Sequence, residues 1–376
     1  MRMLGLDPEY STLVDSCDEV EWNRLILLFS DANVNQTWAY NHTRSKKCGS
    51  IILKYRGNIV AIALVRLIKI PYSNIGFAYV GSGPLWQLKN KLSDINTLRS
   101  ILVALRFEFV IVRKLYLYIH PLIYANSPNF EEVNIAFQEI NGYRYKISNE
   151  YTLFLDLKMS EANLRKGLHP NWRYLLKQAE KEKFCVEIGT SDDLLKTFKE
   201  IYIEMLKLKK YPNAIEIDKI QSIQTKLPEY LKYTIVICTL DNNPMSGGVF
   251  STIGDTGIYF LGATNREGRK NKASYIVHWE VIKWMKMQGL KFYDLGGVSP
   301  KVVPGSYYFK SGIIGKNYKI QQRIVIIEAC ENPIGKIVIN YAMFMLEFSN
   351  LIKRVVYKTK NLLKKSILNQ NYLKRV

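Results

Sequence analysis

The sequence predicts a mixed α/β fold with α+β character, in which two tandem domains with mixed sheets precede a basic C-terminal helical tail. A chain of 376 residues is longer than one average hydrophobic core requires and suits two domains. The same order of hairpin, aromatic strand, helix and strand occurs twice along it. We therefore expect a first domain over residues 1–150, a second over 151–328 and the tail over 329–376.

The first half begins with a helix expected over residues 20–40. A hairpin follows over residues 50–66, because turn residues at Arg56-Gly57-Asn58 separate two runs dense in β-branched side chains. The remaining elements are an aromatic strand, a helix, a strand and a helix, expected over residues 76–80, 94–106, 114–119 and 133–140.

The second half repeats this plan. Strands are expected over residues 233–240, 246–252 and 257–262, followed by a helix over 273–288 that stops at Gly289 and leads into a short strand. Hairpins that precede a helical crossover are typical of mixed sheets. A duplicated domain accounts for the repetition, and chance similarity between hairpins is the alternative.

The short strand ends in a motif that carries the strongest functional signal. Asp294 is followed by Gly296-Gly297, and the chain returns with the pair Phe309-Lys310. Paired glycines allow positive φ and let backbone N–H groups approach a ligand. A lysine beside such a turn is a candidate clamp for a carboxylate, a phosphate or a developing oxyanion. A simple β-turn with an exposed lysine is the alternative.

The charge balance favours anionic partners, since 53 Lys and Arg against 33 Asp and Glu give a net charge of +20. Nucleic acid, anionic lipid and phosphorylated small molecules all fit this field. Five scattered cysteines and four histidines argue against a disulfide framework or a zinc site, so no metal is expected. The acidic N-terminus does not resemble a signal peptide, and no apolar run reaches the roughly 18–20 residues that span a bilayer. We expect a cytoplasmic protein.

A basic helix is expected between the halves, over residues 161–183. Arg173 and Lys177 are four residues apart and share one face, beside Trp172 and Tyr174. This face could grip phosphates, and a solvated helix surface is the alternative.

The tail combines apolar residues at helical spacing over 334–352 with a polybasic end. That combination suits peripheral attachment to the inner face of an anionic membrane through residues 334–376. A helix packed on the core with a frayed basic end is the alternative.

The segment 281–315 resembles the C-terminal signature of the Fem-type aminoacyltransferases, a family built from two tandem GNAT-like domains. In that signature a helix ends in Gly, a Tyr-Asp-x-Gly-Gly strand end follows, and an aromatic turn leads to Phe-Lys-x-Gly. The matching residues here are Gly289, Tyr293-Asp294-Leu295-Gly296-Gly297 and Tyr308-Phe309-Lys310-Ser311-Gly312. Weaker matches are Gln36-Thr37-Trp38, residues 79–85, Trp172-Arg173 and residues 177–181.

The resemblance implies transfer of an amino acid from aminoacyl-tRNA to an amine of a peptidoglycan or other cell-envelope precursor, with no further cofactor. It implies that Lys310 faces the donor and that Arg173 holds an anionic part of the acceptor. Asp294 would position the amine, take its proton or cap the glycine turn. The candidate catalytic residues are Lys310 and Asp294. The candidate substrate-binding residues are Arg173, Lys177, Phe309, Tyr308, Gly296, Gly297 and Trp38.

Two departures from the family pattern qualify this assignment. Asn41 stands where family members that bind a nucleotide-linked precursor have a lysine, and the stretch 190–233 is too short for a long helical-hairpin arm. Acyl-coenzyme A is the alternative donor, for an N-acyltransferase that acts on a cell-surface polysaccharide or sugar precursor. The loop 266–274 has bulky Lys and Asn where a pyrophosphate cradle needs small residues, which favours aminoacyl-tRNA. A non-catalytic module that binds tRNA or membrane is the third hypothesis.

Overall fold

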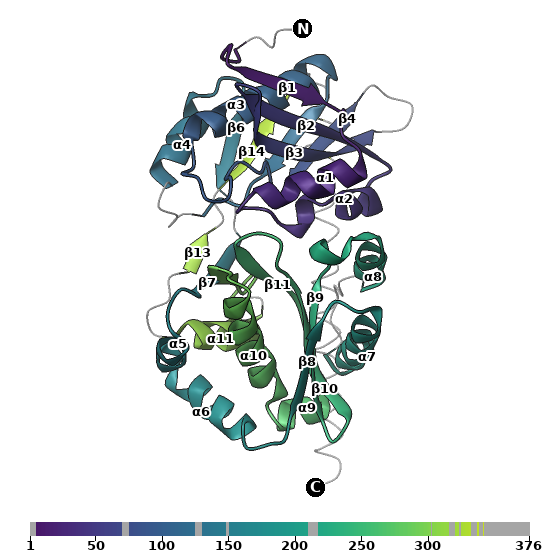
Figure 1. The fold of residues 1–376 in the computed structure, drawn as a ribbon, viewed down its shortest axis with the longest axis vertical. Coiled ribbons are helices and arrows are strands. Elements are labelled where there is room, and N and C mark those ends of the chain that lie inside the picture. Colours follow the sequence, from purple (N-terminus) through teal and green to yellow (C-terminus); the bar gives the residue numbers. More distant parts are fainter. Residues whose placement is uncertain are drawn as a thin grey trace, which may run out of the picture.

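The computed structural model describes residues 5–69, 75–124, 130–147, 150–209, 217–301, 303–315, 320–322, 325–331, 337 and 341. It shows two α/β domains stacked along the long axis of the molecule, each built on one sheet (Figure 1). The predicted fold class, two tandem domains with mixed sheets, is confirmed.

The first domain contains a seven-stranded sheet with the order β1-β2-β3-β4-β5-β14-β6. Its strands are β1 (Tyr10–Val14), β2 (Lys47–Tyr55), β3 (Asn58–Lys69), β4 (Gly76–Gly81), β5 (Tyr116–His120), β14 (Val325–Ala329) and β6 (Arg144–Ile147). Strands β4 and β5 run parallel, and the other neighbours are antiparallel.

The helices of this domain frame the sheet. They are α1 (Glu19–Leu25), α2 (Trp38–Arg44), α3 (Ile95–Leu105) and α4 (Phe130–Glu139), with the 3-10 turns η1 (Ile26–Leu28) and η2 (Val34–Gln36) and the π-helix η3 (Arg106–Val112). The single helix predicted over residues 20–40 is wrong. The side chains of Asn33 and Thr37 accept hydrogen bonds from the amides of Asn35 and Tyr40, so each starts a new short helix.

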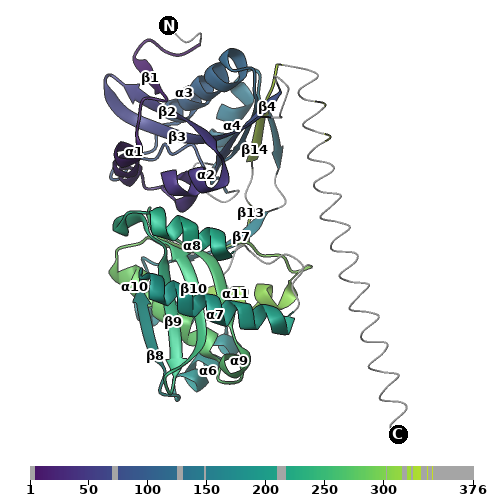
Figure 2. The same cartoon turned by 90° about the vertical axis from the view of Figure 1, so that its right-hand side faces the viewer.

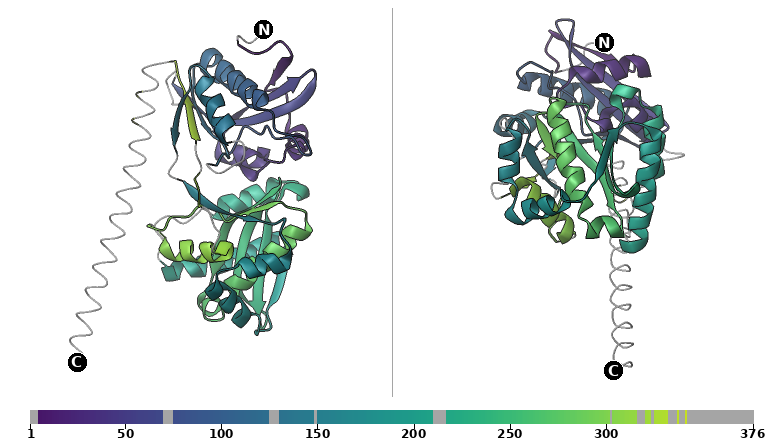
Figure 3. Two further views of the ribbon diagram at one scale, coloured as in Figure 1. Left: turned by 90° about the vertical axis from the view of Figure 1, so that its left-hand side faces the viewer. Right: turned by 60° about the horizontal axis from the view of Figure 1, so that its bottom comes forward.

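The second domain has the matching strand order β8-β9-β10-β11-β12-β7-β13. Its strands are β8 (Cys185–Gly189), β9 (Thr234–Leu240), β10 (Asn243–Ser251), β11 (Thr256–Thr264), β12 (Phe292–Asp294), β7 (Tyr151–Asp156) and β13 (Ile320–Gln322). Its helices are α5 (Glu161–Gly167), α6 (Pro170–Ala179), α7 (Asp192–Lys209), α8 (Ile217–Lys226), η4 (Glu229–Leu231), α9 (Arg266–Lys270), α10 (Ala273–Met287) and α11 (Pro304–Ile314). Helix α7 packs on one face of the sheet and α10 on the other (Figure 3).

The chain crosses between the two domains twice. Strand β7 follows β6 in sequence but lies in the second sheet between β12 and β13, whereas β14 follows β13 and lies in the first sheet between β5 and β6. Strands β7 and β13 lie where the domains meet (Figure 2). The assignment of residues 325–328 to the second domain therefore needs correction. Ile327 and Ala329 belong to the first hydrophobic core, which holds β14 there.

A continuous apolar core joins the domains. Trp22 of α1 and Ile26 of η1 belong to the same buried cluster as Phe198 of α7 and Ile223 of α8. The turn before β11 also docks tightly, since a Cβ on Gly254 would lie 2.5 Å from the carbonyl oxygens of Ser30 and Ala32. Burying side chains of this size stabilises the interface by about 1.5–3 kcal/mol each.

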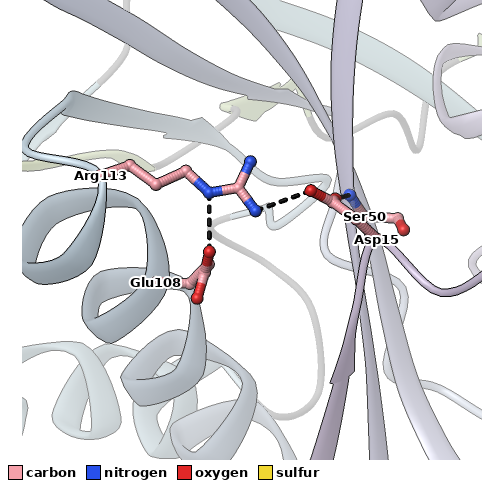
Figure 4. A network of polar contacts seen from close by, with 4 residues as sticks. All are labelled: Asp15, Ser50, Glu108 and Arg113. Carbon is pink, nitrogen blue, oxygen red and sulfur yellow. Dashed lines mark hydrogen bonds and ion pairs between the residues drawn. The ribbon is translucent and has the colours of Figure 1, made fainter.

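A polar network attaches the edge strand β1 to the π-helix (Figure 4). The Arg113 guanidinium contacts Asp15 and Glu108, both at 2.7 Å, and Asp15 also accepts the Ser50 amide at 2.7 Å. All four residues lie in the first domain, away from the site below, so we assign the network a structural role.

The tail lies almost entirely outside the described residues, so its predicted membrane contact stays a prediction. Glu331 pairs with Arg106 at 2.7 Å, and the side chains of Ile337 and Tyr341 are 69% and 65% exposed. Within the part of the chain that the structure describes, no helix has the length and apolar character to cross a membrane.

Candidate active site

A cavity of about 460 Å³ opens between the two domains. The first domain contributes the loops after β4 and β5, including Ser82 and Tyr124. The second contributes the start of β7 and the segment after β12 that contains Gly296 and Gly297. Volumes of this size are typical of small-molecule sites, which occur preferentially at domain interfaces.

Asp294 forms one wall of the cavity and is held by three donors. Its Oδ1 accepts the Gly296 amide at 2.8 Å and the Thr152 hydroxyl, and its Oδ2 accepts the Tyr124 hydroxyl at 3.3 Å. Burial raises the pKa of this carboxyl above its ordinary value, whereas these hydrogen bonds and the charge of Lys310 lower it. Asp294 therefore caps the glycine turn and at the same time lines the cavity.

The two glycines of the turn have different requirements. Gly296 has a φ of +70°, and a Cβ there would lie 2.7 Å from the Tyr259 carbonyl oxygen, so only glycine fits. A Cβ on Gly297 would meet nothing within 4 Å. Gly297 is exposed and lines the cavity, which leaves its backbone accessible to a ligand.

Lys310 lies behind this turn, on α11. Its Nζ donates to the Gly297 carbonyl oxygen at 2.9 Å and lies 5.3 Å from the centre of the Tyr259 ring. Only 8% of Lys310 is exposed, and burial lowers the pKa of its ammonium to about 8. The lysine thus places a readily titrated positive charge against the backbone of the cavity wall.

An aromatic cluster surrounds the lysine. Phe309 packs against His278 at 5.1 Å and Tyr275 at 5.2 Å between ring centres, and the Tyr293 hydroxyl contacts the His278 Nδ1 at 2.8 Å. Burial, with a contribution from Lys310, lowers the pKa of His278 to about 3. His278 is therefore neutral at physiological pH, and Lys310 has no competing cation in this cluster.

Four other sequence-predicted site residues lie outside the lining of the cavity. Trp172 of α6 faces inward against α11, so Arg173 and Lys177 lie on the outer side of α6. There Arg173 donates to the Lys166 carbonyl oxygen at 2.9 Å. Tyr308 is 72% exposed, and Trp38 stacks on His42 at 4.3 Å between ring centres.

Gln36, rather than Trp38, supports the cavity from the first domain. Its buried side chain accepts the Leu64 amide at 2.9 Å and donates to the Gly81 carbonyl oxygen at 2.8 Å, which fixes the loop carrying Ser82. Asn41 has a structural role, because its side-chain amide donates to the Asn35 carbonyl oxygen at 2.8 Å.

The sequence did not indicate Tyr124, Glu150 or Thr152, all of which line the cavity. Thr152 lies in β7 among buried apolar residues. This pattern indicates a buried strand, but it does not indicate a functional site. Among the described residues, no cluster of three His, Cys, Asp or Glu side chains is arranged to hold a metal ion.

Comparison with solved structures identifies the fold. The chain superposes on FemX with a TM-score of 0.71 at 13% sequence identity, covering 87% of this chain and 99% of FemX. A conserved protein of unknown function from Bacteroides thetaiotaomicron gives a TM-score of 0.57 at 7% identity, covering 85% of this chain and 100% of that one. The C-terminal domain of a putative lysylphosphatidylglycerol synthetase from Agrobacterium fabrum gives 0.50 at 12% identity, covering 86% and 95% respectively.

Neither a known protein family nor a curated protein sequence matches the chain. The structural similarity confirms the tandem GNAT-like fold that the Asp294 to Lys310 motif implied.

Proposed function

We propose that the chain is an aminoacyltransferase that moves an activated amino acid from aminoacyl-tRNA to an amine of a peptidoglycan or other cell-envelope precursor. One observation carries the proposal: the Asp294–Gly297 turn, supported by Lys310, forms the wall of a cavity between two GNAT-like domains. The sequence resemblance to Fem-type enzymes and the FemX-like fold support the same reaction class.

The chemistry requires orientation and charge stabilisation more than strong acids or bases. The acceptor nitrogen attacks the ester carbonyl carbon, a C–N bond forms, and the carbonyl oxygen becomes an oxyanion. When the oxyanion collapses, the C–O bond to the ribose breaks, the ribose oxygen takes a proton, and the nitrogen releases one. A positive charge behind an accessible backbone turn favours the oxyanion, and we assign that role to Lys310.

The segment before α10 favours aminoacyl-tRNA over acyl-coenzyme A. A pyrophosphate cradle needs backbone that a ligand can approach closely. Here residues 266–270 form α9, and a Cβ on Gly268 would lie 2.2 Å from the Met245 carbonyl oxygen. The single glycine of this segment therefore serves packing against β10.

The basic surfaces complete the proposal. Arg173 and Lys177, on the outer side of α6, would contact an anionic part of tRNA or of the acceptor, and Phe309 and Tyr308 would support the site from α11. Residues 334–376 would hold the protein at the inner face of an anionic membrane, where a lipid-linked acceptor is found.

Transfer of label tests the function directly. The purified chain is incubated with cell-envelope precursors and either tRNA charged with labelled amino acids or labelled acetyl-coenzyme A. We expect label from tRNA in the precursor fraction, lost in Lys310→Ala and kept in Lys301→Ala, an exposed lysine near the same helix. Label from acetyl-coenzyme A would support the alternative donor, and tRNA binding without transfer would support a non-catalytic module.

A further inference from the structure

The charge of the cavity is opposite to that of the whole chain. Two carboxylates, Asp294 and Glu150, face it, and no Lys, Arg or His is found among the described residues that line it. Its other polar groups are hydroxyls, amides and the glycine backbone, and Leu122 and Phe260 supply apolar wall. A surface that receives phosphate would show the reverse pattern, because an anion is repelled by nearby carboxylates.

Lys310 and His120 are basic side chains that lie close to these carboxylates. Lys310 bonds to the Gly297 carbonyl oxygen from behind the turn and is not part of the lining. His120 lies close to Glu150, with 3.4 Å between Nε2 and Oε2. The direct donors to Asp294 are two hydroxyls and one amide, all of them neutral. Burial raises the pKa of Asp294, so a cation in the cavity would stabilise its ionised form.

We propose that the cavity binds the protonated α-amino group of the aminoacyl donor, with Asp294 and Glu150 as its counter-charges. This inference rests on the proposed function, and it names the chemical feature by which the site selects an aminoacyl group over a simple acyl group. The α-ammonium is two bonds from the reacting carbonyl carbon, so an ammonium held at Asp294 brings that carbonyl to the accessible backbone of Gly297.

The acceptor amine fits this position less well than the donor. A nucleophilic amine must be neutral when it attacks, and carboxylates stabilise its protonated, unreactive form. For the donor the same stabilisation is useful, because the α-amino group stays protonated and does not act as a nucleophile. The cavity volume of about 460 Å³ also accommodates an amino-acid side chain against the apolar wall.

Binding of small donor fragments tests the inference without transfer. The amides of glycine, alanine, serine and lysine, and their N-acetylated counterparts, are titrated into the intact chain at pH 6.5 and followed by ligand-observed NMR. At least one free-amino compound should bind about ten-fold more tightly than its N-acetyl counterpart. That preference should fall about ten-fold in Asp294→Asn and about three-fold in Glu150→Gln. It should be unchanged in Glu204→Gln, which removes an exposed acid on α7.

Glu150→Gln keeps the test independent of folding, because the Glu150 side chain is 59% exposed. Equal affinity for acetylated and free-amino compounds, or no binding of either kind, overturns the inference. A preference that survives in both acid variants also overturns it. Transfer from N-acetylaminoacyl-tRNA at the rate of unmodified aminoacyl-tRNA would refute ammonium recognition while the proposed function stands. Ammonium binding with no transfer from any aminoacyl-tRNA would refute the function alone.

Discussion

Thr152 and Asp294 are hydrogen-bonded to each other across the boundary between β7 and β12. Thr152 belongs to β7, the first strand after the chain enters the second domain, and its hydroxyl also lies 3.0 Å from the Gly296 carbonyl oxygen. Strand β7 therefore reaches both ends of the glycine turn. Through this contact the connection between the domains positions the acid of the site.

Removing the Thr152 hydroxyl should weaken the site and the fold together. Thr152→Val keeps the shape of the side chain but leaves Asp294 without one donor, so we expect a loss of about 1–3 kcal/mol in the free energy of unfolding. The pKa of Asp294 should rise further, because this hydrogen bond lowers it. Urea unfolding measures the loss of stability, and transfer assays measure the effect on the site. Thr152→Ser should restore both the stability and the transfer rate. Equal behaviour of the Val and Ser variants would rule out the hydroxyl as the cause.

Alanine substitutions should separate the roles of the two glycines. Gly296→Ala forces a side chain into positive φ and against the Tyr259 carbonyl oxygen, so it should cost at least about 1–2 kcal/mol of stability. Gly297→Ala meets no atom within 4 Å, and its stability should change by less than about 1 kcal/mol. Its methyl group nevertheless enters the cavity and should slow transfer. A Gly297→Ala variant with full activity would show that no ligand approaches this backbone.

The sequence predicted the turn but not everything that surrounds it. Asp294, Gly296 and Gly297 are close in sequence, so their spacing alone indicates a cavity-lining turn. Thr152 approaches Asp294 because β7 pairs with β12, and Tyr124 approaches it across the domain interface. No local pattern encodes either contact. The direction of Arg173 likewise depends on Trp172 packing against Phe309, a tertiary contact that helical spacing cannot specify.

The pH dependence of transfer should report the protonation of Lys310. Burial lowers the pKa of this ammonium to about 8, so the charge that would stabilise an oxyanion is present below pH 8 and lost above it. We expect the rate with saturating substrates to fall as pH rises through about 8. In Lys310→Arg, which stays protonated, a slower rate should show no such decline. A wild-type rate that instead rises through pH 8, with no such rise in Lys310→Arg, would identify neutral Lys310 as a proton acceptor.

Asp31 should make the protein less stable as pH rises from about 4 to 7. Burial raises the pKa of Asp31 to about 7, with a contribution from Asp255 across the domain interface. Because the folded chain holds this proton over a range where the unfolded chain releases it, the free energy of unfolding falls by at most about 1.4 kcal/mol per pH unit. Asp31→Asn should remove that slope in urea titrations. The exposed Asp241→Asn serves as the control, and an unchanged slope in Asp31→Asn would assign it to another group.

Truncation should reveal how far the first domain depends on β14, the strand that follows the second domain in sequence. A chain ending at Glu331 keeps β14 and should unfold as the full-length protein does. A chain ending at Gln322 leaves β5 and β6 unpaired along the edges that β14 joins and removes Ile327, which is 1% exposed in the first core.

Loss of that side chain alone removes about 1.5–3 kcal/mol, before the ladder hydrogen bonds are counted. Hydrogen exchange should therefore accelerate at the amides of β5 and β6 in the shorter chain and not in the longer one. The cavity should be affected as well, because Tyr124 follows β5 and donates to Asp294. Equal protection in the two truncated chains would mean that the first sheet is stable without its partner strand. Coupling between the domains would then depend on contacts other than β14, among them the apolar core that includes α1, α7 and α8.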